Sequence, residues 1–147
     1  MPKLLLFPLL GAVLLLAACA SFQERFTGVP PKTHLVAAEP REAYRVALLA
    51  LKKLDFHYVR GGPAQGELEA INAIANDETI HQSRQVAVTV RFSGRDGGHT
   101  MVSALFREID ENNPRNDVTG LVTEIPLRES NFYEALFAEL DRQLGKN

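Results

Sequence analysis

The sequence predicts an α+β domain, a two-layer sandwich in which a mainly antiparallel sheet of four to five strands packs against two helices that share one face. Three observations lead to this class. Two stretches carry a single apolar stripe at helical spacing, one stretch alternates strictly between apolar and polar residues, and the middle stretches are joined by short connections. In chain order we expect a strand, a helix, four strands and a second helix.

Both expected helices begin and end at characteristic residues. Pro40 stands at the favourable first helical position, and the stretch 41–54 follows it without Gly or Pro. The second helix is expected over 131–144, with Asn131 and Glu134 in a capping-box arrangement and Gly145 closing it. The apolar stripes consist of Ala43, Ala47, Ala50, Leu51 and Leu54 in the first helix, and of Tyr133, Leu136, Phe137, Leu140 and Leu144 in the second.

The clearest strand is expected over 85–92, where Val86, Val88, Val90 and Phe92 point to one side. Such alternation indicates one buried and one solvated face, as in an antiparallel sheet. We expect its partner over 100–109, joined through the glycine-rich turn 94–98. Further strands are expected over 33–38, 56–59 and 67–75, with a turn at 61–63 and a polar loop over 110–117. An additional short strand over 118–125 is the alternative that the sequence leaves open.

The first residues have the pattern of a secretory signal peptide. Lys3 precedes a mostly apolar run from Leu4 to Ala18, and these 15 residues are fewer than a membrane-spanning helix needs, about 20. We therefore expect a cleaved leader at 1–18, a lipidated cysteine with a flexible tether at 19–32, and a single domain at 33–147. The 13 tether residues after the cysteine reach at most about 45 Å when fully extended.

The end of the apolar run, Leu16-Ala17-Ala18-Cys19, resembles a lipobox, the motif of bacterial lipoprotein processing. The resemblance implies that a diacylglycerol is joined to the Cys19 sulfur and that cleavage makes Cys19 the first residue. Two acyl chains are enough for stable attachment to a membrane. The alternative is an idle cysteine that follows a leader by chance. Ala20, rather than an aspartate, follows the cysteine, which resembles sorting to the outer membrane, facing the periplasm.

Composition restricts the partners and the means of stabilisation. Without residues 1–18 the chain has 129 residues, and its 15 basic and 18 acidic side chains give a formal charge of −3. Because the sequence has no polybasic block, we expect no nucleic-acid partner. Cys19 is the only cysteine, so the fold must rest on apolar burial rather than on a disulfide within the chain.

The sequence shows no catalytic constellation, and we expect neither an enzyme nor a bound cofactor or metal. The four histidines, His34, His57, His81 and His99, are scattered and lack a second ligand at the spacing of a metal site. The stretch 110–117 is rich in oxygen ligands, but it lacks the Gly at position six and the Glu at position twelve of a calcium-binding EF-hand loop. A solvated turn rich in Asn and Asp is the favoured interpretation.

The chain resembles small bacterial lipoproteins of uncharacterised function. The resemblance rests on the lipobox, on the stretch 40–56 and on a Gly-x-[Leu/Ile]-x-Ala pattern at 66–70. More loosely, the order of elements is similar to that of accessory lipoprotein domains in outer-membrane barrel assembly. Beyond Cys19, neither resemblance carries a functional residue over to this chain.

Three functions remain open on the sequence. The first is a non-enzymatic interaction or accessory module of the cell envelope, attached to a membrane through lipid on Cys19 and bound to an envelope protein at the half-polar second face of the sheet. The second is a carrier of a small apolar ligand or lipid, in a groove lined by Phe92, Phe106, Phe132, Tyr133 and Phe137, although such aromatics usually fill a core. The third is an envelope enzyme, which requires a cleft with a perturbed acid or histidine.

Overall fold

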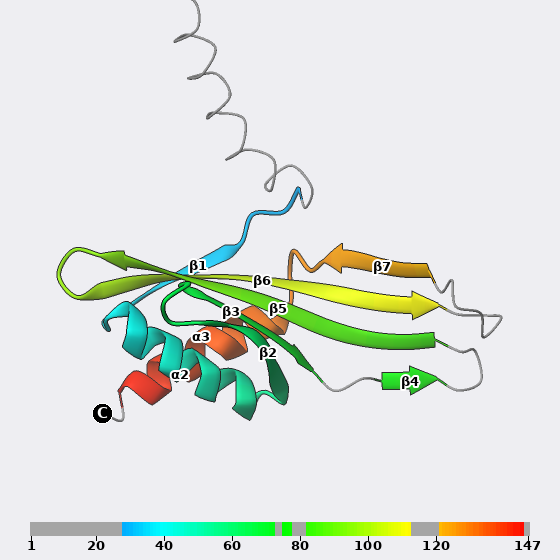
Figure 1. The fold of residues 1–147 in the computed structure, drawn as a ribbon, viewed down its shortest axis with the longest axis horizontal. Helices are drawn as coiled ribbons and strands as arrows, with labels where there is room; N and C mark the ends of the chain where they lie inside the picture. Colours follow the sequence, from blue (N-terminus) through cyan, green and yellow to red (C-terminus); the bar gives the residue numbers. More distant parts are fainter. Residues whose placement is uncertain (1–27, 73–74, 78–81, 113–120, 146–147) are drawn as a thin grey trace, which may run out of the picture. The chain divides into compact units, whose positions relative to one another are not determined.

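The computed structural model describes residues 28–72, 75–77, 82–112 and 121–145. Pro31–Asn147 form one compact unit, which contains every described helix and strand. Its elements, in chain order, are β1 (Lys32–Val36), α2 (Pro40–Lys53), β2 (Phe56–Gly62), β3 (Glu67–Asn72), β4 (Ala75–Asp77), β5 (Gln82–Arg95), β6 (His99–Asn112), β7 (Leu121–Pro126) and α3 (Asn131–Leu144). The predicted α+β class is confirmed, because one antiparallel sheet packs against two helices (Figure 1).

The strands form one sheet in the order β1-β6-β5-β3-β2, with β4 added beside β5 and β7 added beside β6. Every pairing is antiparallel. The described strands number seven rather than the predicted four to five. Two of the additional pairings, β4 with β5 and β7 with β6, lie at one end of the long central strands.

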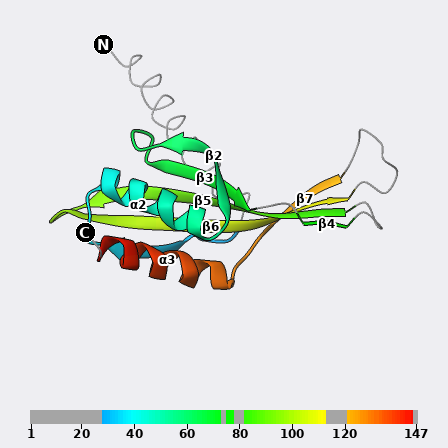
Figure 2. The ribbon, with the colours of Figure 1, turned by 90° about the horizontal axis from the view of Figure 1, so that it is seen from below.

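Strands β5 and β6 divide the sheet into two halves. They pair along their whole length, from Arg95 opposite His99 to Gln82 opposite Asn112. Strands β1 and β3 flank the half nearer the turn, whereas β4 and β7 flank the other half. We call this second half, residues 75–77, 82–86, 107–112 and 121–126, the arm. Figures 1 and 2 show that the arm extends beyond α2 and α3.

The core lies between the two helices and the first half of the sheet. Helix α2 contributes small residues, which allow close approach to its neighbours, and α3 contributes Tyr133, Leu136 and Leu140. As predicted, Val88, Val90 and Phe92 of β5 face this core. The remaining buried members are Val36, Ala43, Val46, Ala47, Ala50, Leu51, Phe56, Leu68, Ala70, Val102, Ala104 and Phe106. Among the described residues, no helix is both long and apolar enough to cross a membrane.

The turn that was expected at 61–63 begins later in the chain, because strand β2 is longer than predicted. The strand continues through Gly61 and Gly62, and the turn occupies 63–66. The register shifts between Tyr58 and Arg60, which marks a bulge. Gly61 has φ +119°, and a Cβ there would lie 2.1 Å from the carbonyl oxygen of Glu67. Only glycine fits this close approach between β2 and β3.

The strand expected over 67–75 is interrupted after Asn72. The Asn72 side-chain oxygen accepts a hydrogen bond of 2.7 Å from the Val86 backbone N–H, and its carbonyl accepts one of 3.0 Å from the Gln85 side chain. These bonds replace the backbone ladder at this point, as Asn side chains commonly do. The result is two strands, β3 and β4, in place of one.

The loop expected over 110–117 was wrong at its start, because Asp110 to Asn112 belong to β6. Strands β5 and β7 flank these residues on both sides, so backbone pairing outweighs their polar composition. Positions 113–117, like 118–120 of the additional short strand over 118–125, lie outside the described residues. At the other end of the sheet, β1 includes Lys32, which was expected in the tether, and ends at Val36 rather than at residue 38.

Helix α3 spans 131–144 as predicted, but its N-cap is Ser130 rather than Asn131. The Ser130 backbone is extended, and its hydroxyl accepts a hydrogen bond of 3.2 Å from the Phe132 N–H. Asn131 is already in the helix, and the third helical residue is Tyr133 rather than a Glu or Gln, so the expected capping box of Asn131 with Glu134 was wrong. Gly145 follows the last helical residue with φ −74°, an ordinary right-handed conformation.

The hydroxyl of Tyr133 bridges β6 and the residue that follows the end of β7. The Phe106 N–H donates to this hydroxyl at 3.2 Å, and the hydroxyl donates to the Leu127 carbonyl at 2.8 Å. The Leu127 N–H donates to the Phe106 carbonyl at 2.9 Å. The hydroxyl is therefore inserted into the ladder just beyond the last residue pair of β6 and β7.

Tyr133→Phe should lower the free energy of unfolding by about 1–3 kcal/mol, because the buried Phe106 N–H loses its acceptor while the ring packing stays. Urea denaturation measures this change. The matched control is Tyr58→Phe, which removes an exposed hydroxyl bonded to the Gly61 carbonyl and should change stability by less than about 0.5 kcal/mol. Equal losses in the two variants would contradict the proposed importance of the bridge.

A nearly buried carboxylate links α2 to α3. Glu139 accepts hydrogen bonds from Arg142 and Gln143 of its own helix and from Lys53 of α2, the last at 3.3 Å. The Arg142 hydrogen bond is the main cause that lowers the pKa of Glu139 from 4.5 to about 2, although burial opposes it. The ionised form is therefore favoured in the folded protein.

Because this pKa is lower in the folded than in the unfolded chain, the stabilisation is complete above pH 4.5 and disappears as the pH falls toward about 2. Glu139→Gln should therefore flatten the fall of the melting temperature across this window, while lowering the melting temperature at neutral pH. Thermal unfolding followed by circular dichroism over this pH range measures both effects. The control is Glu134→Gln, at an exposed position on the same helix. This variant should leave the fall of the melting temperature at low pH unchanged.

Candidate functional site

Only some of the site residues predicted from the sequence lie in the described part of the chain. Leu16, Ala17, Ala18 and Cys19 lie outside the described residues, as does His81. His34 stacks on Phe137 with ring centroids 4.9 Å apart, and its Nε2 lies 2.9 Å from Asp141 Oδ1. This histidine therefore attaches β1 to α3. Within the described part of the chain, no three His, Cys, Asp or Glu side chains gather in a way that could hold a metal ion.

The aromatic residues that the sequence offers for a ligand groove pack mainly on one another. Phe106 is fully buried and contacts the rings of Phe56, Phe132 and Tyr133, with centroids 4.9–5.8 Å apart. Phe92 packs against Tyr44 of α2. These contacts are those of a filled core, which is the alternative to a ligand groove that the sequence left open.

The sheet face opposite the helices is the candidate site that the register defines. Directly paired residues in a sheet share a face, so the register assigns this face without ambiguity. We call it the open face. Its members are His57 and Arg60 of β2, Glu67, Glu69 and Ile71 of β3, Gln85, Ala87, Thr89, Arg91, Ser93 and Arg95 of β5, Met101, Ser103, Leu105, Arg107 and Ile109 of β6, Thr33 and Leu35 of β1, and Glu124 of β7.

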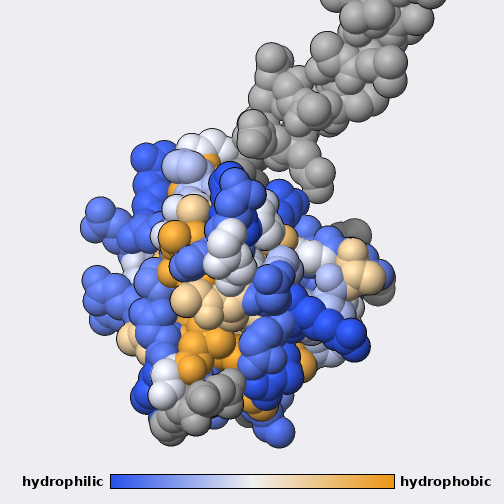
Figure 3. Space-filling model, turned by 90° about the vertical axis from the view of Figure 1, so that its left-hand side faces the viewer, coloured by the Kyte–Doolittle hydropathy of each residue, from blue (hydrophilic) through white to orange (hydrophobic). Residues whose placement is uncertain are grey.

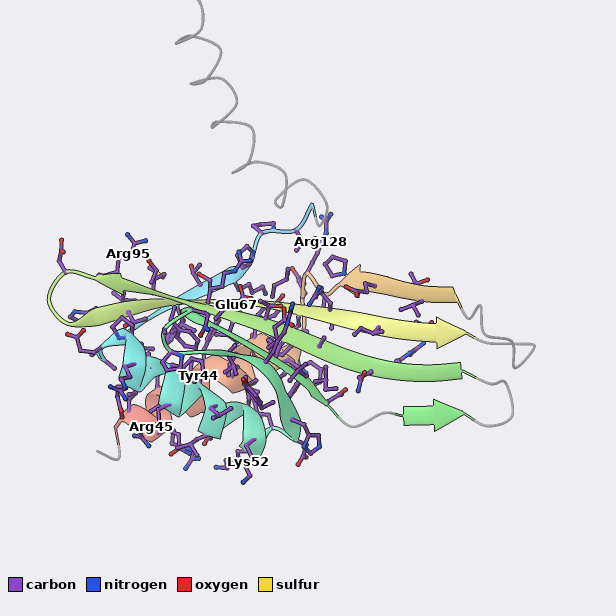
Figure 4. The ribbon with its side chains drawn as sticks, viewed as in Figure 1. Tyr44, Arg45, Lys52, Glu67, Arg95 and Arg128 are labelled. Atoms are coloured by element: carbon purple, nitrogen blue, oxygen red, sulfur yellow. The ribbon has the colours of Figure 1, made fainter. Side chains whose placement is uncertain are left out.

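The figures show how charge is placed around this face. In Figure 4, Arg95 lies near the β5–β6 turn, whereas Arg45 and Lys52 project from α2 on the other side of the molecule. Figure 3 views the end of the domain that carries this turn and shows hydrophobic surface with hydrophilic surface on both sides. Hydrophilic side chains therefore lie on both sides of the hydrophobic surface at this end of the domain.

A belt of ion pairs crosses the open face from β2 to β7. Arg60 donates two hydrogen bonds to Glu69, of 2.6 and 2.8 Å, and Arg91 Nε lies 2.9 Å from a Glu67 oxygen. We call Arg60, Glu67, Glu69, Arg91, Arg107 and Glu124 the charged belt. Arg107 donates a hydrogen bond of 3.0 Å to Glu124. Arg107 also donates one of 3.2 Å to the Thr89 hydroxyl. Three cations and three anions make the belt electrically balanced.

Glu69 interacts with all three arginines of the charged belt. The hydrogen bonds from Arg60 are the main cause that lowers its pKa, although partial burial raises it, and the charges of Arg107 and Arg91 lower it further. Hydrogen bonding to Glu69 also raises the pKa of Arg60. The ionised forms of Glu69 and Arg60 are therefore both favoured, and a surface that meets this pair must match both signs.

An apolar strip runs beside the charged belt, along β1 and β6. Leu35 lies directly opposite Met101 and is 51% exposed. Leu105 lies further along β6 on the same face, beyond the polar pair Thr33 and Ser103, and is half-buried. We call Leu35, Met101 and Leu105 the apolar strip. Apolar side chains that become buried in the centre of an interface, with polar pairs around them, favour binding through desolvation.

Sequence patterning anticipated a half-polar second face but missed its organisation. The alternation in 85–92 places Thr89 and Arg91 on this face. The charged belt depends on cross-strand register, which joins Arg60 to Glu69 beside a bulge and Arg107 to Glu124 between β6 and β7. The available signal was the i, i+2 spacing of Glu67 and Glu69 on an expected strand.

Comparison with protein-family models, with curated proteins and with solved structures found no match to this chain. The open face, with its charged belt and apolar strip, therefore stands as a candidate site on its own geometry.

Proposed function

We propose that this chain is a membrane-anchored bacterial lipoprotein that acts as a non-enzymatic interaction module in the cell envelope. The observation that carries the proposal is the open face, a broad sheet surface with an ordered charged belt and an exposed apolar strip. Its partner is an envelope protein. The expected location is the outer membrane, with the domain facing the periplasm.

The proposed anchor is consistent with where the domain begins. The segment that follows Cys19 enters the fold at Lys32, the first residue of β1, which is an edge strand of the sheet. Leu35 and Thr33 of the same strand lie on the open face. A tether that reaches at most about 45 Å would leave this face free to meet a second protein near the membrane surface.

The chemistry of the open face favours a folded protein partner over a single charged ligand. The charged belt has no excess of either sign, so it offers no strong field to attract a nucleic acid or a small anion. Balanced ion pairs instead provide specificity through matched charges on the partner, while the apolar strip contributes desolvation.

Lipidation is tested by mass spectrometry of the full chain made in a bacterial host. The expected mature chain begins at Cys19 and carries a diacylglyceryl adduct on its sulfur. Cys19→Ala should abolish both the adduct and incorporation of labelled palmitate, whereas Ser21→Ala, two residues away, should retain them. Label that persists in Cys19→Ala, or an unmodified wild-type chain in the membrane fraction, would overturn the anchor.

Docking on the open face is tested with a matched pair of leucines. Leu35 on the open face and Leu49 on α2 are 51% and 42% exposed. Leu35→Glu should reduce recovery of envelope partners by roughly tenfold or more, because it buries an unpaired charge in the interface. Leu49→Glu should leave recovery unchanged. Crosslinking of intact cells, followed by quantitative mass spectrometry of the purified complexes, measures both variants, and equal recovery would exclude the open face as the docking surface.

A further inference from the structure

The four edge strands of the described sheet differ in how they are protected against further pairing. Edge strands expose unpaired N–H and C=O groups, and proteins usually block them with bulges, prolines or very short strands. Strand β2 has a bulge after Tyr58, β1 follows Pro30 and Pro31, and β4 has only three residues. Strand β7 has six residues and none of these devices before Pro126, its last residue.

The hydrogen bond beyond the end of β7 shows which of its backbone groups face outward. The Leu127 N–H donates to the Phe106 carbonyl, in register with the β6–β7 ladder. Because bonding alternates along an antiparallel pair, Ile125 and Thr123 also direct their backbone groups toward β6. The N–H and C=O groups of Val122 and Glu124 therefore point away from the sheet. Pro126, which has no N–H, occupies an outward position, as expected at an edge.

We propose that β7 pairs with β7 of a second copy of this chain, antiparallel and with Thr123 on the two-fold axis. In this register Val122 of each copy lies opposite Glu124 of the other. The outward backbone groups of these residues then form hydrogen-bonded pairs on both sides of Thr123. The two sheets join into one continuous sheet, because the free N–H and C=O groups of each β7 bond to those of the other.

Register and charge favour this arrangement over its neighbours. Paired residues must share a face, so the axis passes through a residue rather than between two. An axis through Glu124 places two carboxylates directly opposite each other, which is destabilising. An axis through Val122 pairs Glu124 with residue 120, before the strand begins. The axis through Thr123 pairs residues 121–125 of both copies and places no like charges opposite each other.

The surroundings of β7 suit a second copy of the same strand. Val122 and Ile125 are 56% and 51% exposed, and both are β-branched residues that favour strands. Glu124 is already paired with Arg107 at 3.0 Å, so its charge is largely neutralised within its own copy. A single strand pairing buries little area, and attachment of both copies to one membrane would raise their effective concentration.

Disulfide crosslinking in intact cells tests this pairing. The wild-type chain has one cysteine, Cys19, and serves as the background control. In Thr123→Cys the two new cysteines form a non-hydrogen-bonded pair with Cα atoms about 4.5 Å apart, within the range that a disulfide spans. A thiol oxidant should therefore produce a covalent dimer. Ile125→Cys, half-exposed on the same strand, has no copy of itself opposite and should link at the wild-type level.

Two further substitutions, made in the Thr123→Cys chain, separate pairing from general damage to the arm. Val122→Asp faces Glu124 of the other copy and should lower the crosslinked fraction by roughly three- to tenfold, whereas Val122→Lys should raise it. Loss of local structure would not give opposite signs at one exposed position. Equal linking at positions 123 and 125, the same effect from both charges, or a Thr123→Cys product that contains a different protein would each overturn self-pairing. None of these results depends on recovery of a partner at Leu35.

Discussion

The pairing of β5 with β6 is the constraint on which the rest of the domain depends. Fourteen residues of each strand pair around the turn at 96–98, and every other strand adds to one of these two or, in the case of β2, to β3. At about 3.4 Å per residue such a strand extends roughly 48 Å, whereas a 14-residue helix at 1.5 Å per residue covers about 21 Å. Two helices of this length leave part of each central strand uncovered, and the arm is the consequence.

The same constraint explains the contrast between the two faces. On the helix side, side chains of β5 and β6 interdigitate with small residues of α2 and with the aromatic cluster around Phe106. On the open face, no described helix supplies apolar cover, so the long polar side chains satisfy one another across strands. Arginine suits this task, because its planar group reaches a carboxylate on the next strand with two hydrogen bonds, as Arg60 does with Glu69.

Local patterns were enough to predict much of the fold. The small-residue stripe of α2 and the alternation of 85–92 depend only on nearby residues, and both are confirmed. The glycine-rich turn predicted over 94–98 is confirmed at 96–98, whereas Gly94 and Arg95 belong to β5. The errors have a different origin. Asp110–Asn112 join β6 because of strands on both sides, and β3 ends because the Asn72 side chain bonds to Val86. The candidate site was missed for the same reason, because cross-strand pairing brings the residues of the charged belt together. The lipobox, by contrast, is a sequence feature, and its role stays a prediction.

The attachment point of the tether has a mechanical consequence in the proposed anchored state. A mechanical force between the membrane and a partner on the open face would act on the domain at Lys32, the first residue of an edge strand. Side-chain contacts attach that strand to the C-terminal helix. Lys32 Nζ lies over the Tyr133 ring, and His34 stacks on Phe137 and bonds to Asp141. The first strand and the last helix would thus share the load, and the sequence-distant ends of the domain would resist extension as one element.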